Sequence, residues 1–410
     1  MPLPLEPIAR PLPGLPEILR ACTPVNIVNA FVAFLFAASA PVAIILAAGA
    51  KGNLSQGDLA SWIFAAFAIN SLVTLALSIL YRTPLAVFWT IPGTVLAGNA
   101  LTHLSFAEVI GAYLATGLLL LVLGLTGLVR AVMARIPMPI IMGMVAGVFL
   151  KFGLAWIGAF RDDLGIALAM TAAFALASAA PAIERRAPPM IAVLVVGCLA
   201  LVLLGKTPPW PQMPFPDMLA RPALFAPAFS LAAMAELVIP LAITVLAAQN
   251  AQGIAILTAR GHTPPVNAVT AACGATSLAV ALVGCVSTCL TGPCNAILTA
   301  SGERQSQYAG AILLALISLL FGAFAPLFTA LMLATPPAFI ATLAGIALLK
   351  VLQSAFQISF KADFTLGALI AFMVTLADFP IFGIGAAFWG LVFGVATSAL
   401  LERGDFAKAG

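Results

Sequence analysis

The chain has 410 residues, of which 63% are hydrophobic and only 8% are charged, and its mean hydropathy is +1.14. So few charged residues cannot cover the surface of a soluble protein of this size, whereas a lipid-facing surface needs none, so we expect a polytopic membrane protein. The net charge of +4 is small and scattered along the chain, which argues against nucleic acid as a partner.

Residues 1–24 precede the first long apolar run, which exceeds the length of a signal-peptide apolar region, so we expect an uncleaved cytoplasmic tail. Fourteen segments of membrane-spanning character follow. They are expected at 25–48, 58–80, 84–101, 107–129, 137–160, 164–182, 189–205, 229–257, 266–284, 286–301, 307–330, 336–357, 364–380 and 382–400. The third and tenth are short and broken, and little more than Pro380 separates the last two, so twelve spans remain an alternative.

The distribution of lysine and arginine supports fourteen spans with both termini in the cytoplasm. Cytoplasmic loops of membrane proteins are enriched in these residues. With this topology twelve of them fall on the cytoplasmic side, and four fall on the other side: Lys51, Arg161, Lys206 and Arg221.

The two halves of the chain repeat one another. Three residues of the first half have counterparts 199 positions later, pairing Gly111 with Gly310, Pro137 with Pro336 and Lys151 with Lys350. Because the two copies are offset by seven spans, an odd number, the second copy must be inverted in the membrane. Inverted repeats are typical of secondary transporters.

The third and tenth segments are both interrupted by proline and glycine. The first contains Thr90 followed by Pro92 and Gly93, and the second contains Thr291, Gly292, Pro293 and Asn295. In each, a short β stretch is expected to reach the midplane and a half-helix to begin there, with its positive dipole end toward a shared point. We therefore expect an anionic substrate at this point; the alternative is that the prolines only kink two ordinary helices.

A second polar cluster lies in the eighth segment, where Gln249 and Asn250 interrupt an apolar run. Carboxamides are costly in hydrocarbon unless they face protein or a cavity, so they are candidates for binding the substrate. The alternative is a helix-packing hydrogen-bond cluster. The equivalent first segment carries Ser39 ahead of Pro41, which makes Ser39 a further candidate.

Proton coupling has two candidate carriers, Glu236 in the eighth segment and Asp378 near the thirteenth, because acids within the membrane are usually functional. Glu236 precedes Gln249 by 13 positions, or about 20 Å of helix, so the two are not expected to share a pocket unless the helix is broken. A weak acid that crosses in its protonated form is the alternative.

Several motifs together resemble the benzoate:proton symporter family over residues 25–400. They are Pro92-Gly93, the run from Gly143 to Val148, Ile239-Pro240-Leu241 before Gln249-Asn250 and Gly253-Ile254-Ala255, and the run from Gly383 to Gly390. The resemblance implies a fold shared with the uracil permease and sulfate carriers, and uptake of benzoate or a similar aromatic carboxylate with a proton across the bacterial inner membrane. No cofactor is implied beyond the proton gradient.

The resemblance also implies two domains that move against each other. A core domain would comprise residues 25–130 and 229–330, and a gate domain residues 131–205 and 331–400. Residues 206–228 would connect the repeats outside the cytoplasm, and 401–410 would form a cytoplasmic tail. Relatives dimerise through the gate domain, so a homodimer is an implied partner.

The chain departs from the family at the pocket, with Thr90-Ile91 in place of a serine-threonine pair and fewer glycines around Thr291. This leaves open a carrier of another small anion or a nucleobase. An anion channel would need a continuous polar ring and an enzyme would need a nucleophile with a base or a metal set. The sequence shows no such pattern, and its six cysteines lack metal spacing.

Overall fold

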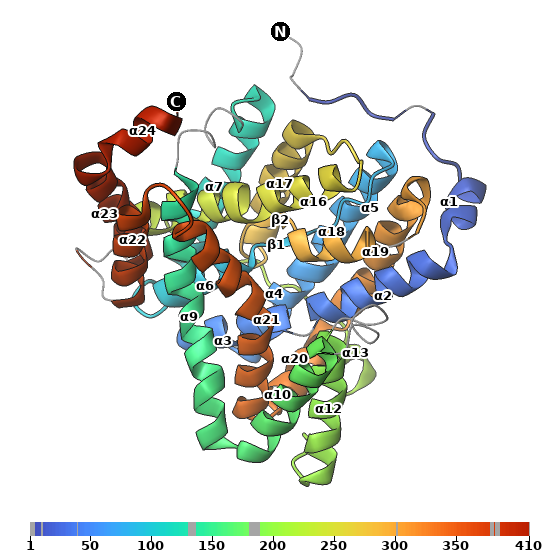
Figure 1. Ribbon diagram of the computed structural model, residues 1–410. Coiled ribbons are helices and arrows are strands. Elements are labelled where there is room, and N and C mark those ends of the chain that lie inside the picture. Colours follow the sequence, from blue (N-terminus) through green and yellow to red (C-terminus); the bar gives the residue numbers. More distant parts are fainter. Residues whose placement is uncertain are drawn as a thin grey trace.

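The computed structural model describes residues 5–9, 11–38, 40–129, 137–179, 189–300, 302–377, 381 and 386–409 (Figure 1). Within these residues the chain is mostly helical, with one two-stranded sheet. Two candidate residues, Ser39 and Asp378, lie outside the described residues, and so do Gly383, Ile384 and Gly385 of the last family motif.

The first half contains α1 (Leu15–Ala21), α2 (Pro24–Ala38), α3 (Ala40–Lys51), α4 (Gln56–Phe64), η1 (Ala65–Ile69), α5 (Asn70–Tyr81), β1 (Val87–Trp89), α6 (Ile91–Ala100), α7 (Phe106–Thr126), α9 (Met138–Asp162), α10 (Leu164–Ala179) and α12 (Pro189–Leu203). The second half contains α13 (Phe215–Met218), α14 (Leu231–Ala233), η2 (Met234–Val238), α15 (Ile239–Ile243), η3 (Thr244–Asn250), α16 (Ala251–Ala259), α17 (Val266–Ala281), β2 (Thr288–Leu290), α18 (Gly292–Leu298), η4 (Arg304–Ser306), α19 (Gln307–Ala323), α20 (Ala325–Leu333), α21 (Pro337–Ser359), α22 (Thr365–Ala377), α23 (Ala386–Leu401) and α24 (Arg403–Ala409).

Six helical stretches in the described residues are long and apolar enough to cross a membrane, or seven if one bent pair counts as a span. Five further apolar helices have 10–17 residues. The count of fourteen crossings therefore stays a prediction. One expected segment, 307–330, is wrong as a single helix, because α19 ends at Ala323 and α20 continues separately before bending by 107° into α21. Pro326, the second residue of α20, supplies no backbone N–H to continue α19.

The two strands pair antiparallel and show how the repeats are related. Phe88 pairs with Cys289, which lies 201 positions later. Thr90 and Thr291, each directly before a short helix, are separated by the same 201 positions. Because Phe88 thus pairs with its own repeat equivalent, a half-turn about this pair exchanges the two copies. The strand register confirms that the repeats are inverted.

Helix packing follows the same symmetry, with α7 against α17 and α19 against α5. The helices approach closely because small residues lie at the crossings, as is common between membrane helices. A Cβ atom on Gly274 of α17 would meet the backbone nitrogen of Leu121 in α7, and one on Gly322 of α19 would meet the backbone nitrogen of Ala68 in η1.

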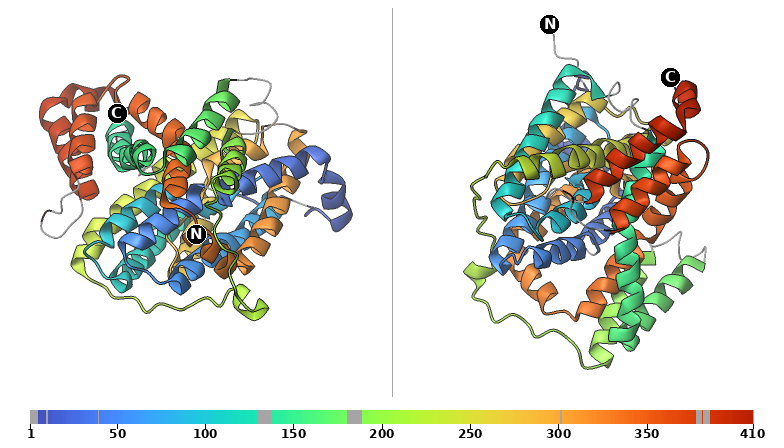
Figure 2. Two further views of the ribbon diagram at one scale, coloured as in Figure 1. Left: turned by 90° about the horizontal axis from the view of Figure 1, so that it is seen from below. Right: turned by 90° about the vertical axis from the view of Figure 1, so that its left-hand side faces the viewer.

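Helices α9, α10, α12, α21, α22 and α23 pack mainly on one another and form a second group beside the elements that surround the sheet (Figures 1 and 2). Pro137 and Pro336, the repeat-related prolines, directly precede α9 and α21, which lie side by side. Gly143 and Gly147 bring α9 against the backbone of α22. The two groups meet where α21 contacts α3 and α9 contacts α6.

The described part of the N-terminal segment lies against both repeats. Glu6 accepts hydrogen bonds from the backbone N–H groups of Asn267 and Ala268 at the start of α17, both at 3.0 Å. The Arg82 guanidinium, just after α5, pairs with Glu17 at 2.9 Å. A carboxylate at the first turn of a helix satisfies its free N–H groups, so this segment ties the end of α5 to the start of α17.

Gly274→Ala should lower the unfolding temperature of the purified protein in detergent, because the new methyl group would displace the backbone of α7. Overpacking of this kind costs about 1–3 kcal/mol. Gly158→Ala is the matched control, since a Cβ atom there meets nothing within 4 Å. An equal loss of stability in both variants would contradict the tight α7–α17 crossing.

Candidate functional site

The strand pair lies at the centre of the first helix group, which consists of the elements that surround the sheet. The ladder of backbone hydrogen bonds between the two strands extends by one residue at each end. The Thr90 N–H donates to the Ser287 carbonyl at 3.0 Å, and the Thr291 N–H donates to the Ala86 carbonyl at 2.9 Å. Since side chains alternate along a strand, one face of the sheet carries three cross-strand pairs. They are Ala86 with Thr291, Phe88 with Cys289 and Thr90 with Ser287.

Side chains from neighbouring helices satisfy the outward-facing backbone of this sheet. An unpaired backbone N–H buried away from water is strongly unfavourable, so each needs an acceptor. The bonds are Val87 N–H to Thr74 Oγ1 at 2.9 Å, Thr288 N–H to Ser277 Oγ at 2.9 Å and Leu290 N–H to Asn250 Oδ1 at 2.7 Å. The polar residues of these apolar helices therefore hold an isolated strand pair in place.

Asn295, a candidate for binding the substrate, is also part of this scaffold. Its Oδ1 accepts from the Ala86 N–H at 3.0 Å, and its Nδ2 donates to the Thr291 carbonyl at 2.8 Å and to the Ala86 carbonyl at 3.3 Å. The two bonds to Ala86 connect α18 with the residue directly before β1, and the bond to Thr291 lies within the first turn of α18. The structure thus shows a scaffold role for Asn295 and for the side-chain oxygen of Asn250.

The two short helices that follow the strands differ at their first turns. Thr90 caps α6, since its hydroxyl accepts from the Gly93 N–H at 3.2 Å and lies 3.3 Å from the hydroxyl of Thr244 in η3. Gly93 has no room for a side chain, because a Cβ atom would meet Thr90 and Leu241. Thr291 makes no such cap bond in α18.

Gly292 follows Thr291 and packs against Gln252, whose amide fills the place that a Cβ atom would take. Pro92 and Pro293 occupy the first turns of their helices, where a missing N–H costs nothing. The sequence therefore predicts the local backbone at both positions, whereas the unequal capping of the two helices depends on contacts with η3.

Five buried polar atoms at the sheet and at η3 have no oxygen or nitrogen partner among the described residues; two of them are Trp89 Nε1 and Asn250 Nδ2. The other three are Thr291 Oγ1, Ser287 Oγ and Gln249 Oε1. Thr291 and Ser287 share the face of the sheet that contacts Thr244, and Gln249 lies on η3, which packs against β2. A bound solute with polar groups would satisfy these atoms, and no charged side chain of the described residues lies among them.

An aromatic group borders the same strands. Phe67 of η1 lies with its ring centre 5.8 Å from that of Phe88 and 5.0 Å from that of Trp89. Phe321 of α19 approaches Phe67 to 4.6 Å. Edge-to-face and tilted contacts of this kind are favourable for aromatic rings. The site thus combines polar atoms with an apolar aromatic wall.

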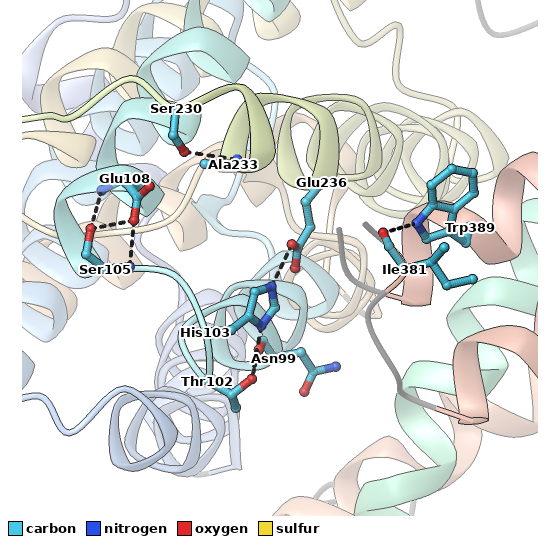
Figure 3. Close-up of polar contacts among 10 residues, drawn as sticks. All are labelled: Asn99, Thr102, His103, Ser105, Glu108, Ser230, Ala233, Glu236, Ile381 and Trp389. Carbon is cyan, nitrogen blue, oxygen red and sulfur yellow. Dashed lines mark hydrogen bonds and ion pairs between the residues drawn. The ribbon is translucent and has the colours of Figure 1, made fainter. Parts of the chain in front are cut away.

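Glu236, the described candidate for proton coupling, is only 5% exposed and faces the loop after α6 (Figure 3). Its Oε2 lies 2.9 Å from Nε2 of His103. Glu236 is on η2 and Gln249 on η3, two π-helical turns of one unbroken stretch, and such turns are frequent at functional sites. The two residues lie 13 positions apart along this helical stretch. Sequence reasoning missed His103, because nothing in a loop histidine indicates which distant acid it meets.

The structure also contains a hollow of about 280 Å³ between α4 and the connection after α12. Its lining includes Gln56, Ser61, Asp217 and Arg221, and Arg221 pairs with Asp217 at 3.2 Å. None of the candidate residues lines it, so the strand pair and the Glu236 contact remain the sites of interest.

Comparison with known proteins finds a matching family and similar membrane proteins. The family described as "Benzoate membrane transport protein" matches residues 20–400. The chain is 30% identical over 381 residues to the benzoate membrane transport protein of Acinetobacter baylyi, covering 91% of this chain and 94% of that one. It is 29% identical over 383 residues to inner membrane protein YdcO of Escherichia coli, covering 92% and 95%.

Solved structures with the same fold have little sequence similarity. The transmembrane domain of the cyanobacterial bicarbonate transporter BicA matches with a TM-score of 0.60 at 16% identity, over 94% of this chain and 99% of that one. The murine anion transporter Solute Carrier 26 family member A9, in an inward-facing state, matches with a TM-score of 0.61 at 13% identity, over 92% and 68%. These likenesses establish the polytopic fold.

Asn295→Leu should reduce the stability of the protein far more than Gln249→Leu. The first change leaves the buried Ala86 N–H without an acceptor, which costs about 1–3 kcal/mol, whereas the Gln249 oxygen has no bond to lose. Thermal unfolding of both purified variants tests this. Equal stability of the two would remove Asn295 from the scaffold.

Proposed function

The chain belongs to the benzoate membrane transport protein family, and we propose that it carries benzoate or a similar small aromatic carboxylate across the bacterial inner membrane together with a proton. The family match covers most of the chain, and its members are transporters rather than enzymes. The inner membrane location follows the E. coli relative, whose name states it.

The observation that carries the substrate class is the combination of unpaired polar atoms and aromatic rings at the strand pair. A benzoate ion has a charged carboxylate at one end and an apolar ring at the other. The Thr291 hydroxyl and the Asn250 Nδ2 group can donate to the carboxylate, since each carries O–H or N–H groups and has no oxygen or nitrogen partner among the described residues. The rings of Phe88 and Phe67 offer a surface for the aromatic end.

Transport would proceed by alternating access. The first helix group holds the strand pair and would form the core domain, and the second group would form the gate domain against which the core slides. Fourteen crossings, cytoplasmic termini, an elevator-type motion and a homodimer through the gate belong to this proposal. Inverted repeats support it, because two inverted halves can exchange their inward and outward arrangements.

Purified protein in liposomes should take up radiolabelled benzoate saturably, faster with an inward proton gradient, and substituted benzoates should compete. Protein-free liposomes measure the passage of neutral benzoic acid through lipid. Uptake blocked by uracil or sulfate rather than by aromatic carboxylates would shift the substrate to a nucleobase or another anion. Absence of any uptake above the protein-free background would contradict the proposal.

Thr291→Val should weaken benzoate binding by roughly 10-fold or more, because a hydrogen bond to a charged group contributes about 1.5–3 kcal/mol. The matched control is Thr342→Val in α21, since its hydroxyl is equally buried and equally without a partner but lies in the other helix group. Equilibrium binding of labelled benzoate to the purified variants measures both. Unchanged affinity in Thr291→Val would exclude this hydroxyl from the site.

A further inference from the structure

The His103–Glu236 contact joins two parts of the chain that sequence alone does not bring together. His103 lies in the loop between α6 and α7, and its side chain is 27% exposed. Glu236 is almost completely buried on η2, within an apolar helical stretch. An exposed imidazole against a buried carboxylate provides a route for a proton between water and the interior.

The hydrogen bonds around His103 fix how many protons the contact holds (Figure 3). The Thr102 hydroxyl donates to the Asn99 carbonyl at 2.7 Å, so toward His103 Nδ1, 3.2 Å away, its oxygen can only accept. With the hydroxyl in this orientation, the matching tautomer of His103 carries its hydrogen on Nδ1. The 2.9 Å contact of Nε2 with Glu236 Oε2 then needs a second proton between two atoms that would otherwise repel.

That second proton can reside on either partner without changing the count. An imidazolium donating to a carboxylate and a carboxylic acid donating to an imidazole hold the same number of protons and the same total charge of zero. Loss of the proton leaves a neutral imidazole facing a carboxylate, with a charge of −1 and no hydrogen bond. For this tautomer the 2.9 Å contact corresponds to the protonated state, and loss of the proton removes the hydrogen bond.

Few charged groups of the described residues lie on the elements packed against η2. Elements packed on η2 include α7, which begins near Glu108, and α6, whose Asn99 amide oxygen binds Lys51 at 2.7 Å. Glu108 is engaged by the Ser105 N–H at 2.9 Å. The described residues of α14, α15 and α23, which also pack on η2, bring no charged side chain.

We propose that the His103–Glu236 pair is the proton-binding site of the carrier and that it takes up one proton for each anion bound. This inference rests on the proposed function. The pair is linked to the strand pair through α6, whose ten residues extend about 15 Å between Thr90 and the His103 loop. It is linked to the second helix group because η2 packs on α23.

Charge explains why such a pair couples the two solutes. With a proton on the His103–Glu236 pair and an anion at the two strands, these two sites together contribute one negative charge to the moving core domain. With neither, the deprotonated pair carries the same negative charge. Binding of only one of them changes the charge that must move through a low-dielectric environment, which is unfavourable. Anion and proton therefore cross together.

The test is calorimetric titration of the purified protein with benzoate in buffers that differ in ionisation enthalpy, which counts the protons taken up. Wild type should take up close to one proton per benzoate in the pH range where the benzoate-free pair is deprotonated, and its affinity should fall about tenfold per pH unit there. Glu236→Gln should bind benzoate with no proton uptake and less than a twofold change per pH unit. Glu108→Gln, which keeps its helix cap, should behave as wild type.

The outcomes separate the two proposals. Failure of folded wild type to bind benzoate would contradict the proposed function. Binding by wild type without proton uptake would overturn the proton site while leaving the carrier intact. Proton uptake by Glu236→Gln equal to that of wild type would also overturn it. If the contact were only structural, Glu236→Gln would change the stability of the protein but not the number of protons taken up with benzoate.

Discussion

The constraint on which this architecture depends is that a two-stranded sheet buried among apolar helices must have its backbone hydrogen-bonded. Each strand pairs with the other on one edge only, which leaves the outer edges to be satisfied by side chains. Thr74, Ser277, Asn250 and Asn295 supply the acceptors, each from a different element. The sheet in turn positions the starts of α6 and α18. Polar residues in the apolar segments are therefore needed for the fold before any substrate binds.

This requirement separates residues that look alike in the sequence. The side-chain oxygens of Asn250 and Asn295 accept hydrogen bonds from backbone N–H groups. The hydroxyl of Thr291 and the oxygen of Gln249 make no bond to oxygen or nitrogen within the described residues. The inverted repeats also differ at equivalent positions. Thr90 caps its own helix against Thr244, and Thr291 does not. Two related halves thus produce one asymmetric site, as recognition of an asymmetric ion requires.

The proposed anion site and the proposed proton-binding pair lie toward opposite ends of α6. Such an arrangement connects the two solutes through a rigid helix and through net charge rather than through direct contact. The π-helical turns η2 and η3 place Glu236 and Gln249 on one helical stretch but at separate levels. In this proposal the pair binds a proton while the anion lies between the strands and the aromatic group.

Composition, the repeat and the placement of proline and glycine were sufficient to predict a membrane carrier with inverted halves, because hydropathy and backbone stereochemistry are local properties. The same local rules placed extended residues before Pro92 and Pro293, where β1 and β2 occur. They placed one membrane-spanning segment over 307–330, where α19 instead ends at Ala323 and α20 begins at Ala325. Only the tertiary structure decided that Asn295 holds β1 and that His103 meets Glu236, since hydrogen bonds between residues 133 or 209 positions apart leave no periodic pattern in the sequence.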